Sequence, residues 1–394
     1  MADSKIRVCR DDDMKLNEIC EVYSGYALKA FNDAEDGFPV IKIGNIFMDG
    51  TLNLEECQYT TDGVNEKYYS QRGDIYIALS GATTGKIGIM DASEKYVINQ
   101  RVGIVRQKSD DIPQEYIKYF LLRQTDRILQ EAAGCAQPNI SPRQIAEYVV
   151  PDTSQEKMQE ICEVLDRIKK IIDSRKVQIS ALDNLIKARF VELFGNPEIN
   201  DMHWDEHKLS DELSVIGGYA FKSDSFQEDG IPVLRIGNIN AGVFRPINLV
   251  FWKKDDTLFK YLMYPGDLVM SLTGTVGKDD YGNVCILGSE YEMYYLNQRN
   301  AKLELKDGLD KYYLAELLKF PQIKKRLTGI SRGVRQANIS NKDILDLSVP
   351  IPPMKLQQQF ADFVTQVDKS KVKVQKALDE TQKLFDSLMQ QYFG

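Results

Sequence analysis

The sequence contains one unit written twice, and this repeat constrains the fold more than any other feature. After small insertions the second copy regains its register with the first, and ungapped matches of this length are unlikely to arise by chance. Self-similarity over half the chain predicts two copies of one folding unit. The matching pairs, of which the first two lie at an offset of 193 residues, are 15–27 with 208–220, 37–46 with 230–239, 99–101 with 297–299, and 137–141 with 336–340.

Each copy ends in a segment whose apolar residues recur at alternating steps of four and three. This heptad pattern predicts a long helix that needs a partner helix along its apolar seam. The first seam spans residues 161–193, which at ~1.5 Å per residue is a helix of about 48 Å. The apolar seam positions are Ile161, Leu165, Ile168, Ile172, Ile179, Leu182 and Ile186 in the first copy, and Phe360, Val364, Val367, Val374, Leu378, Phe385 and Leu388 in the second.

The two long helices are expected to pair with each other. Antiparallel pairing would place the two globular parts at opposite ends, whereas parallel pairing would crowd both at one end, so we predict an antiparallel coiled coil. Polar residues in the seam cost stability and are expected to fix its register. These polar seam residues are Arg175, Arg189, Lys371 and Thr381.

The predicted fold class is therefore α+β, with pseudo-two-fold symmetry between two mixed α/β domains and their helices. The expected boundaries are 1–152 for the first domain, 153–199 for its long helix and linker, 200–351 for the second domain, and 352–394 for its long helix. Apolar runs bordered by Gly and Asp predict strands at 39–46, 74–79 and 97–105, and helical spacing predicts helices at 115–129 and, broken by Pro321, at 312–327.

Composition places the chain among folded proteins, because 43% of its residues are hydrophobic and 27% are charged, with a net charge of −8. Residues 1–13 are polar, and no run of about 18 apolar residues occurs, so we expect a cytoplasmic protein with no membrane partner. The six cysteines form no C-x-x-C pair, which favours buried reduced thiols over disulfides or a zinc cluster.

No motif for catalysis or for a metal site is complete. The segment Gly81–Lys86 has three residues between its glycines where a phosphate-binding loop needs four, and Ile87 follows where Ser or Thr is required. His203 and His207 are the only histidines, and Trp204 occupies the position where a zinc protease has Glu. We therefore expect neither catalytic nor metal-binding residues in this chain.

A basic stretch in the second copy leads into one of the repeated loops. Residues 317–342 contain seven Lys and Arg residues and no Asp or Glu, and they include the repeated Gln-x-Asn-Ile-Ser. A run of charge is usually a solvated face. Arg, Lys, Asn and Gln are, however, the side chains that read the edges of guanine and adenine, so the combination favours DNA binding.

In its order of motifs, the whole chain resembles the specificity subunit of a type I restriction–modification system. The motifs that carry the resemblance occur twice in the same order: Gly-Tyr-Ala-x-Lys, Ile-Gly-Asn-Ile, Gly-Asp followed by a Ser/Thr-Gly turn and Gly-Lys, Asn-Gln-Arg, and Gln-x-Asn-Ile-Ser before Val-Pro. Each is weak alone, whereas the duplicated order is specific.

The resemblance implies a DNA-binding subunit that reads a bipartite, asymmetric target, with one half-site for each target-recognition domain and the helix pair as a ruler between them. It further implies two methylation subunits that use S-adenosylmethionine, and restriction subunits that use ATP and Mg²⁺. The chain itself would bind double-stranded DNA and no cofactor, and would carry no catalytic activity.

The candidate DNA-binding residues lie in the repeated motifs. In the first copy they are Lys29, Thr83, Thr84, Lys86, Asn99, Arg101, Gln137 and Asn139, and in the second Lys222, Thr275, Lys278, Asn297, Arg299, Arg332, Arg335, Gln336 and Asn338. Residues identical in both copies cannot distinguish two different half-sites, so they suit scaffold or phosphate contacts. Specificity is expected where the copies differ, as at 135–137 against 334–336.

Arg335 is the residue for which we hypothesise contact with a guanine. Relaxed specificity at one position of the half-site in Arg335→Ala would support this, whereas a uniform loss of affinity would indicate a phosphate contact. Two other functions stay open from the sequence: a coiled-coil scaffold or adaptor without DNA readout, and a stand-alone nuclease with an unrecognised site. Assays of the chain with DNA and Mg²⁺, and gel shifts with a methylation partner, distinguish them.

Overall fold

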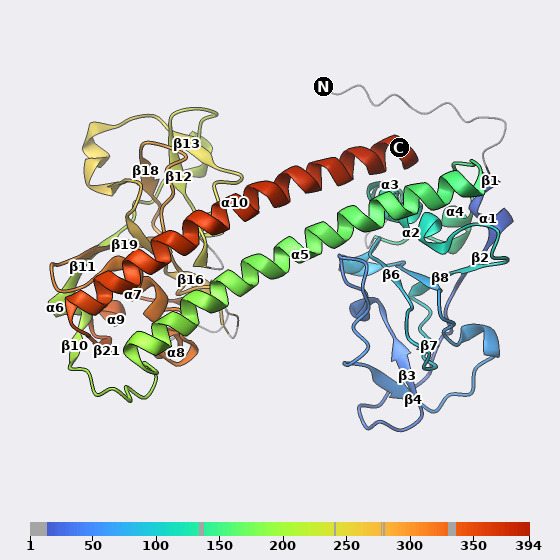
Figure 1. Cartoon of the computed structure of the whole chain (residues 1–394), viewed down its shortest axis with the longest axis horizontal. Coiled ribbons are helices and arrows are strands. Elements are labelled where there is room, and N and C mark those ends of the chain that lie inside the picture. Colours follow the sequence, from blue (N-terminus) through green and yellow to red (C-terminus); the bar gives the residue numbers. More distant parts are fainter. Residues whose placement is uncertain (1–13, 134–137, 240–241, 277, 279, 330–335) are drawn as a thin grey trace. The chain divides into compact units, whose positions relative to one another are not determined.

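The computed structural model describes residues 14–394 except 134–137, 240–241, 277, 279 and 330–335. The chain divides into two compact units, of which the first comprises residues 1–176 with 376–394, and the second comprises residues 177–375. Two long helices, α5 (Gln155–Phe194) and α10 (Met354–Phe393), contribute to both units (Figure 1). Each unit therefore contains part of the long helix from each repeat.

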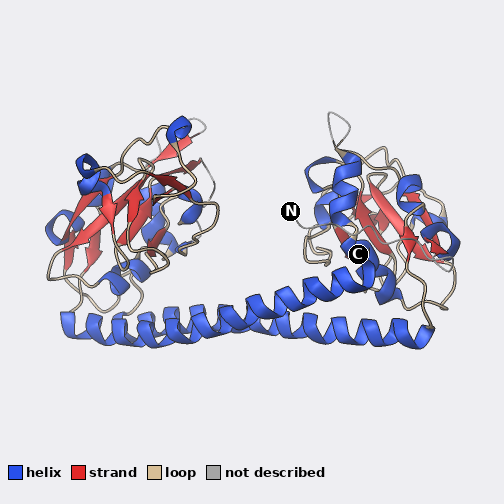
Figure 2. Ribbon diagram, turned by 90° about the horizontal axis from the view of Figure 1, so that it is seen from above, coloured by secondary structure: helices blue, strands red, loops and turns tan. Residues whose placement is uncertain are grey.

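The first unit combines two small sheets with short helices (Figure 2). One sheet has the strand order β2-β8-β5-β6 and is antiparallel, and the other has the order β4-β3-β7 with β3 and β7 parallel. The elements are β1 Met14–Lys15, α1 Leu16–Ile19, β2 Cys20–Ser24, β3 Phe38–Ile41, η1 Ile43–Asn45, β4 Gln58–Thr60, η2 Glu66–Tyr68, β5 Ile75–Ala78, η3 Gly81–Thr83, β6 Ile87–Ile89, β7 Val97–Ile98, β8 Val102–Gln107, α2 Gln114–Arg123, α3 Thr125–Ala132, α4 Pro142–Ala146 and β9 Val149–Val150.

The second unit repeats this topology, with one more strand in its second sheet, and its strand orders are β11-β19-β15-β17 and β13-β12-β18-β14. Its elements are β10 Glu206–Lys208, α6 Leu209–Glu212, β11 Leu213–Gly217, η4 Ser223–Ser225, β12 Ile231–Leu234, η5 Ile236–Asn238, β13 Val250–Trp252, η7 Asp256–Tyr261, β14 Leu262–Met263, β15 Leu268–Ser271, β16 Thr273–Thr275, β17 Val284–Ile286, β18 Tyr294–Leu296, β19 Asn300–Leu305, α7 Lys311–Leu317, α8 Pro321–Thr328, β20 Gln336–Asn338, α9 Asn341–Leu345 and β21 Ser348–Pro350.

The long helices run antiparallel within each unit, as predicted. In the first unit the Arg175 guanidinium donates to the carbonyl of Ala377 and to the hydroxyl of Thr381. In the second, the Lys371 ammonium lies 2.5 Å from the Asp183 carboxylate. All the apolar seam positions named above are buried or half-buried.

Each unit closes its core with a tyrosine bonded to the Val-Pro motif and packed against the end of a long helix. The Tyr116 hydroxyl donates to the Pro151 carbonyl at 2.9 Å, and its ring lies 4.9 Å from that of Phe393 at the end of α10. The Tyr313 hydroxyl donates to the Pro350 carbonyl at 2.7 Å. Its ring lies 4.8 Å from that of Phe194 at the end of α5. The repeated Val-Pro is thus part of the core.

Three elements differ from their predicted extents. The strand predicted at 97–105 is two strands, because the chain turns at residues 99–101. The strand predicted at 39–46 ends at Ile41 and continues as the 3₁₀ turn η1. The helix predicted at 115–129 is divided into α2 and α3 at Gln124, whereas the break predicted at Pro321 is present, with α8 beginning at that residue.

No helix in the described part of the chain has an apolar stretch that could cross a membrane. The described cysteines, Cys20, Cys57, Cys162 and Cys285, are free thiols. Burial raises the pKa of Cys20, Cys162 and Cys285 to about 12, so these three thiols are protonated near neutral pH.

Candidate nucleic-acid interface

In each unit the backbone of one leucine joins three of the repeated motifs. The Leu79 amide donates to the Arg101 carbonyl at 2.9 Å, and the Leu79 carbonyl accepts from the Ile140 amide at 2.9 Å. In the second unit the amide and carbonyl of Leu272 make the same bonds, to Arg299 at 2.8 Å and to Ile339 at 2.8 Å. The Ser/Thr-Gly turn, the Asn-Gln-Arg turn and the Asn-Ile-Ser segment therefore converge twice.

Short strand pairing holds the Ser/Thr-Gly turn against the Asn-Ile-Ser segment. In the second unit β16 pairs antiparallel with β20, so that Thr273 faces Asn338 and their side-chain oxygens lie 3.1 Å apart. In the first unit the same contact is a single bridge between Ser80 and Asn139. Asn139 and Asn338 are exposed at this junction.

The Asn-Gln-Arg turn is built by its own asparagine. The Asn99 side-chain oxygen accepts the Arg101 amide proton at 3.1 Å, and Asn297 accepts from Arg299 at 3.3 Å. Such a bond from Asn to the backbone two residues on is an Asx turn. Asn99 and Asn297, which we took as candidate DNA contacts, therefore shape the loop, while the side chains of Arg101 and Arg299 are exposed.

The Ile-Gly-Asn-Ile motif forms a 3₁₀ turn beside the Asn-Gln-Arg turn. The buried Asn45 side chain donates to the carbonyls of Asn53 and Glu56, at 3.0 and 3.1 Å. Asn238 does the same to Arg245 and Ile247, at 3.0 and 2.9 Å. These amides satisfy backbone carbonyls in the loop that follows, and they explain the repeated Asn by structure.

In the first unit, the threonine side chains of the turn after β5 point into the protein. Thr84 is 5% exposed and donates to the Gly81 carbonyl at 2.7 Å. The Thr83 hydroxyl is buried without a hydrogen-bond partner among the described residues, and Lys86 is half-buried. These side chains are less available to DNA than those of the second copy.

In the second copy Thr275 and Lys278 are exposed. The Thr275 amide donates to the Asp280 carboxylate at 2.8 Å, and this bond lowers the pKa of Asp280.

The exposed polar groups of the converged loops include Gln100, Arg101, Gln298 and Arg299. In the second unit Gln298 and Arg299 line a hollow of about 610 Å³ together with Arg235, Gly237 and Asn248, and with apolar side chains such as Phe221 and Phe226. Exposed guanidinium and amide groups around a hollow can donate hydrogen bonds to phosphates or base edges. Lys29 and Lys222 follow the Gly-Tyr-Ala turns and are also exposed.

Several candidates cannot be placed. Gln137, Arg332 and Arg335 lie outside the described residues. Gln336 is described through its backbone in β20, where it faces Thr275. The hypothesis that Arg335 contacts a guanine therefore stays a prediction.

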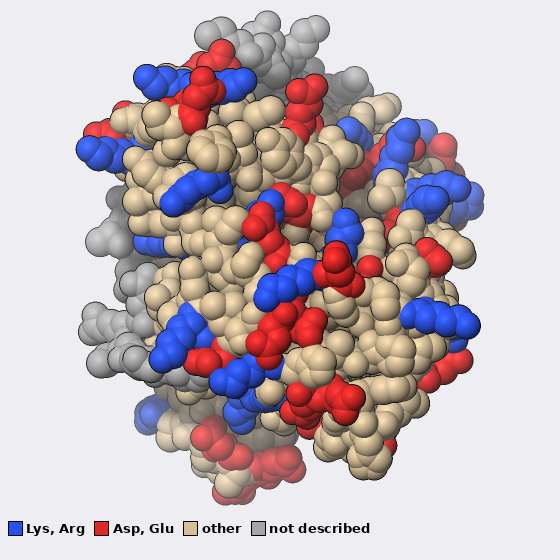
Figure 3. All heavy atoms as spheres, turned by 90° about the vertical axis from the view of Figure 1, so that its left-hand side faces the viewer, with Lys and Arg blue, Asp and Glu red and all other residues tan. Residues whose placement is uncertain are grey.

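The basic stretch of the second copy is partly engaged within its own unit. The Lys319 ammonium lies 3.0 Å from the Glu316 carboxylate, Lys324 is 9% exposed and donates to Asn283 at 2.7 Å, and Arg326 donates to the Ser348 carbonyl at 2.7 Å. On the face shown in Figure 3, Lys and Arg are interspersed with Asp and Glu. On this face, positive charge is thus local to particular side chains.

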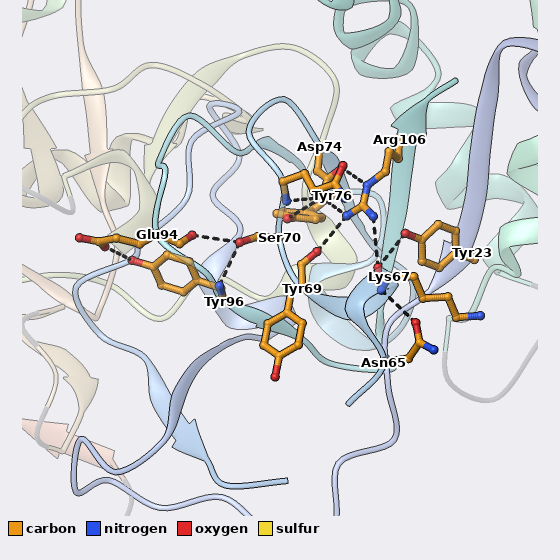
Figure 4. Close-up of polar contacts among 11 residues, drawn as sticks. Tyr23, Asn65, Lys67, Tyr69, Ser70, Asp74, Tyr76, Glu94, Tyr96 and Arg106 are labelled. Carbon is orange, nitrogen blue, oxygen red and sulfur yellow. Dashed lines mark hydrogen bonds and ion pairs between the residues drawn. The ribbon is translucent and has the colours of Figure 1, made fainter. Parts of the chain in front are cut away.

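A buried ion pair that the sequence analysis does not predict supports the segment that precedes β5 in the first unit. The Arg106 guanidinium bonds both oxygens of Asp74, the shorter contact being 2.6 Å, and the two side chains are 13% and 1% exposed. Burial opposes the charge on Arg106, but its hydrogen bonds to Asp74 and the charge of that carboxylate raise its pKa overall. Arg106 also donates to the carbonyls of Lys67 and Tyr69, which holds that segment against the sheet (Figure 4).

A repeated pattern in the sequence could have revealed this support. Lys-Tyr, followed after four residues by Gly-Asp, occurs at 67–74 and again at 260–267. In the second unit Asp267 bonds Lys302 at 3.0 Å instead of an arginine. The aspartate is thus repeated, while its cationic partner comes from another position of the neighbouring strand.

Comparison with known proteins gives concordant results. The family model of the type I restriction modification DNA specificity domain matches residues 12–183 and again 202–381. The specificity subunit of the type I restriction enzyme MjaVIII from Methanocaldococcus jannaschii is 23% identical, with 84% of each chain covered.

Two solved structures share the fold. The S subunit of a type I restriction–modification system from M. genitalium has a TM-score of 0.54 and 17% identity, with 98% of each chain covered. A chain of another type I system, described for complex assembly and conformational transition, has a TM-score of 0.50 and 14% identity. The alignment with this second structure covers 97% of the present chain and 96% of the solved chain.

Proposed function

Since the chain belongs to the family of type I restriction–modification DNA specificity proteins, we propose that each of its two units reads one half of a bipartite, asymmetric DNA target. The observation that carries this proposal is the duplicated convergence of three repeated motifs: the Ser/Thr-Gly turn, the Asn-Gln-Arg turn and the Asn-Ile-Ser segment. In each unit these loops are joined by backbone bonds, so their exposed side chains keep a defined arrangement. Two such arrangements in one chain suit two half-sites.

Differences between the units support asymmetric reading. In the first unit the Ser/Thr-Gly turn pairs with the Asn-Ile-Ser segment through a single β-bridge at Ser80. In the second unit the corresponding residues form a strand, β16, which pairs with β20. Thr84 is buried in the first unit, whereas Thr275 is exposed in the second. The side chains presented to base edges would therefore differ, while shared groups such as Arg101 and Arg299 would contact phosphates.

The proposal assigns the long helices to spacing and assembly. Each helix has 40 residues and at ~1.5 Å per residue is about 60 Å long. A stiff antiparallel pair would hold the spacer between half-sites constant.

Catalysis would belong to partners. We propose two methylation subunits that bind S-adenosylmethionine and methylate adenine, and restriction subunits that use ATP and Mg²⁺, with this chain as the non-catalytic scaffold. Two observations motivate a need for partners in DNA binding. The net charge is −8, and several basic residues are engaged internally. Affinity would then depend on further phosphate contacts from partner subunits.

Removing one heptad from both long helices tests the proposal. Deleting 172–178 together with 375–381 removes facing segments, because Arg175 contacts Ala377 and Thr381. Seven residues at ~1.5 Å each correspond to about 3 base pairs at ~3.4 Å. We expect methylome sequencing of a host with this chain and its methylation subunit to show the same two half-sites with a spacer about 3 base pairs shorter.

Deleting the heptad from one helix alone serves as the matched comparison. The seam would then be out of register, and we expect methylation to be lost. A double deletion that leaves both half-sites and spacer unchanged would refute the assignment of the helices as a ruler. A wild-type motif with no gap between specified bases would refute the bipartite reading.

A further inference from the structure

At one repeated glycine position, the structure shows no need for glycine in either unit. Gly44 and Gly237 occupy the middle of the 3₁₀ turns η1 and η5, in the Ile-Gly-Asn-Ile motif. Neither has a φ in the left-handed region, and a Cβ built on either would have no neighbour within 4 Å. Alanine would fit both sites, and glycine costs helical turns stability relative to alanine.

Other glycines that recur at the same offset do have structural reasons. A Cβ on Gly25 would lie 2.3 Å from the Ile98 carbonyl oxygen, and one on Gly218 would lie 2.1 Å from that of Asn297. In the remaining pairs, glycine is required because φ is positive or because a Cβ would meet close neighbours. These pairs are Gly37 with Gly230, Gly73 with Gly266, and Gly81 with Gly274. Gly44 and Gly237 are the exceptions among these described pairs.

Both exceptional glycines are exposed beside the converged loops. Gly44 follows strand β3, and the Asn99 amide donates to the carbonyl of Ile41 at the end of that strand, with an N–O distance of 3.0 Å. Gly237 lines the hollow that is also lined by Gln298 and Arg299. The open space above Gly237 is thus next to exposed amide and guanidinium groups, and Gly44 occupies the same position of the repeated motif in the first unit.

We infer that Gly44 and Gly237 are points where the sugar-phosphate backbone of duplex DNA approaches the protein main chain too closely for a Cβ. This inference rests on the proposed DNA-binding function and adds a specific contact to it. Glycine serves where a ligand must approach the backbone. Because the residue is identical in both units while the half-sites differ, the contact is independent of base sequence.

The test uses the full chain, alone and assembled with its methylation subunit, and a fluorescein-labelled pool of random-sequence 40-base-pair duplexes at low salt. A random pool suffices because the contact is sequence-independent, and low salt strengthens phosphate contacts. We expect Gly44→Ala and Gly237→Ala each to weaken binding on the order of tenfold, measured as Kd by fluorescence anisotropy. The urea midpoint of each variant should equal or exceed that of the wild type.

Gly63→Ala is the matched control. Gly63 is exposed, has open space at its Cβ and no left-handed φ, and its counterpart at the same offset is Asp256. It should change neither Kd nor the urea midpoint. If the wild-type chain bound the duplexes and the Kd of both glycine variants changed by no more than twofold, the inference would be overturned and the proposed function would stand.

Two further results are decisive. A clear fall in urea midpoint for Gly44→Ala or Gly237→Ala would show a structural need for glycine and would also overturn the inference. Absence of duplex binding by the wild-type chain at low salt, both alone and assembled with its methylation subunit, would count against the proposed function itself, and the inference would fall with it.

Discussion

Replacing Asp74 with alanine is expected to destabilise the first unit by about 3–5 kcal/mol, because it leaves the Arg106 guanidinium buried without its counter-charge. Asp74 is 1% exposed and accepts both short bonds from Arg106, together with bonds from the Gln71 amide and the Tyr76 hydroxyl. Loss of the carboxylate therefore leaves several donors unpaired (Figure 4). Hydrogen exchange of the β5 and β8 amides should accelerate by roughly two to four orders of magnitude.

Glu66→Ala provides the comparison within the same unit. Its ion pair with Lys95 has the same length, 2.6 Å, but the side chains are 72% and 55% exposed. An exposed pair contributes about 0–1 kcal/mol, so exchange in β5 should change little. Equal effects of Asp74→Ala and Glu66→Ala would contradict the importance given to burial. Amides of β15 in the second unit serve as an internal reference.

Phe190→Ala is expected to destabilise the second unit by about 3–5 kcal/mol. Phe190 is fully buried in α5, and its ring lies between 4.9 and 5.4 Å from four other aromatic rings. These rings come from α5, the α7–α8 region and α10, namely Phe194, Tyr313, Phe320 and Phe360. Truncation would open a cavity that joins all of these elements.

Hydrogen exchange in α7 and β15 measures this effect. Val191→Ala removes a neighbouring side chain that is 39% exposed, and it should cost well under 1 kcal/mol. If Phe190→Ala left exchange in the second unit within threefold of the wild type, the aromatic cluster would not be the core that joins α5 to the second unit. Amides of β5 in the first unit should be unaffected.

Much of the architecture was predictable because it depends on periodic patterns. A seam of apolar residues at steps of four and three cannot be exposed along its whole length, so it predicts a helix that is paired. Arg175 and Thr381, both predicted to fix the register, contact each other. Strand ends were less predictable. At 99–101 the chain turns between two apolar strands, where the Arg101 amide donates to the Asn99 side chain and the Val102 amide donates to the Asn99 carbonyl.

The candidate interface was predictable as a set of loops and less so as a set of side chains. An asparagine that could read adenine is equally able to satisfy a backbone group of its own loop. Asn99, Asn297, Asn45 and Asn238 take the second role. The sequence pattern cannot distinguish the two roles, because the distinction depends on which carbonyl or amide lies within hydrogen-bond distance after folding.

The amino-acid sequence alone thus determined the duplication, the family resemblance and the antiparallel pairing of the long helices, since all three follow from the order and spacing of residues along the chain. Tertiary structure decided which repeated residues are consumed by the fold and which face open space. Gly25 and Gly44 are both repeated glycines, yet only the first lies against a backbone carbonyl. Steric room and hydrogen-bond partners are properties of the packed chain, and they separate scaffold from surface.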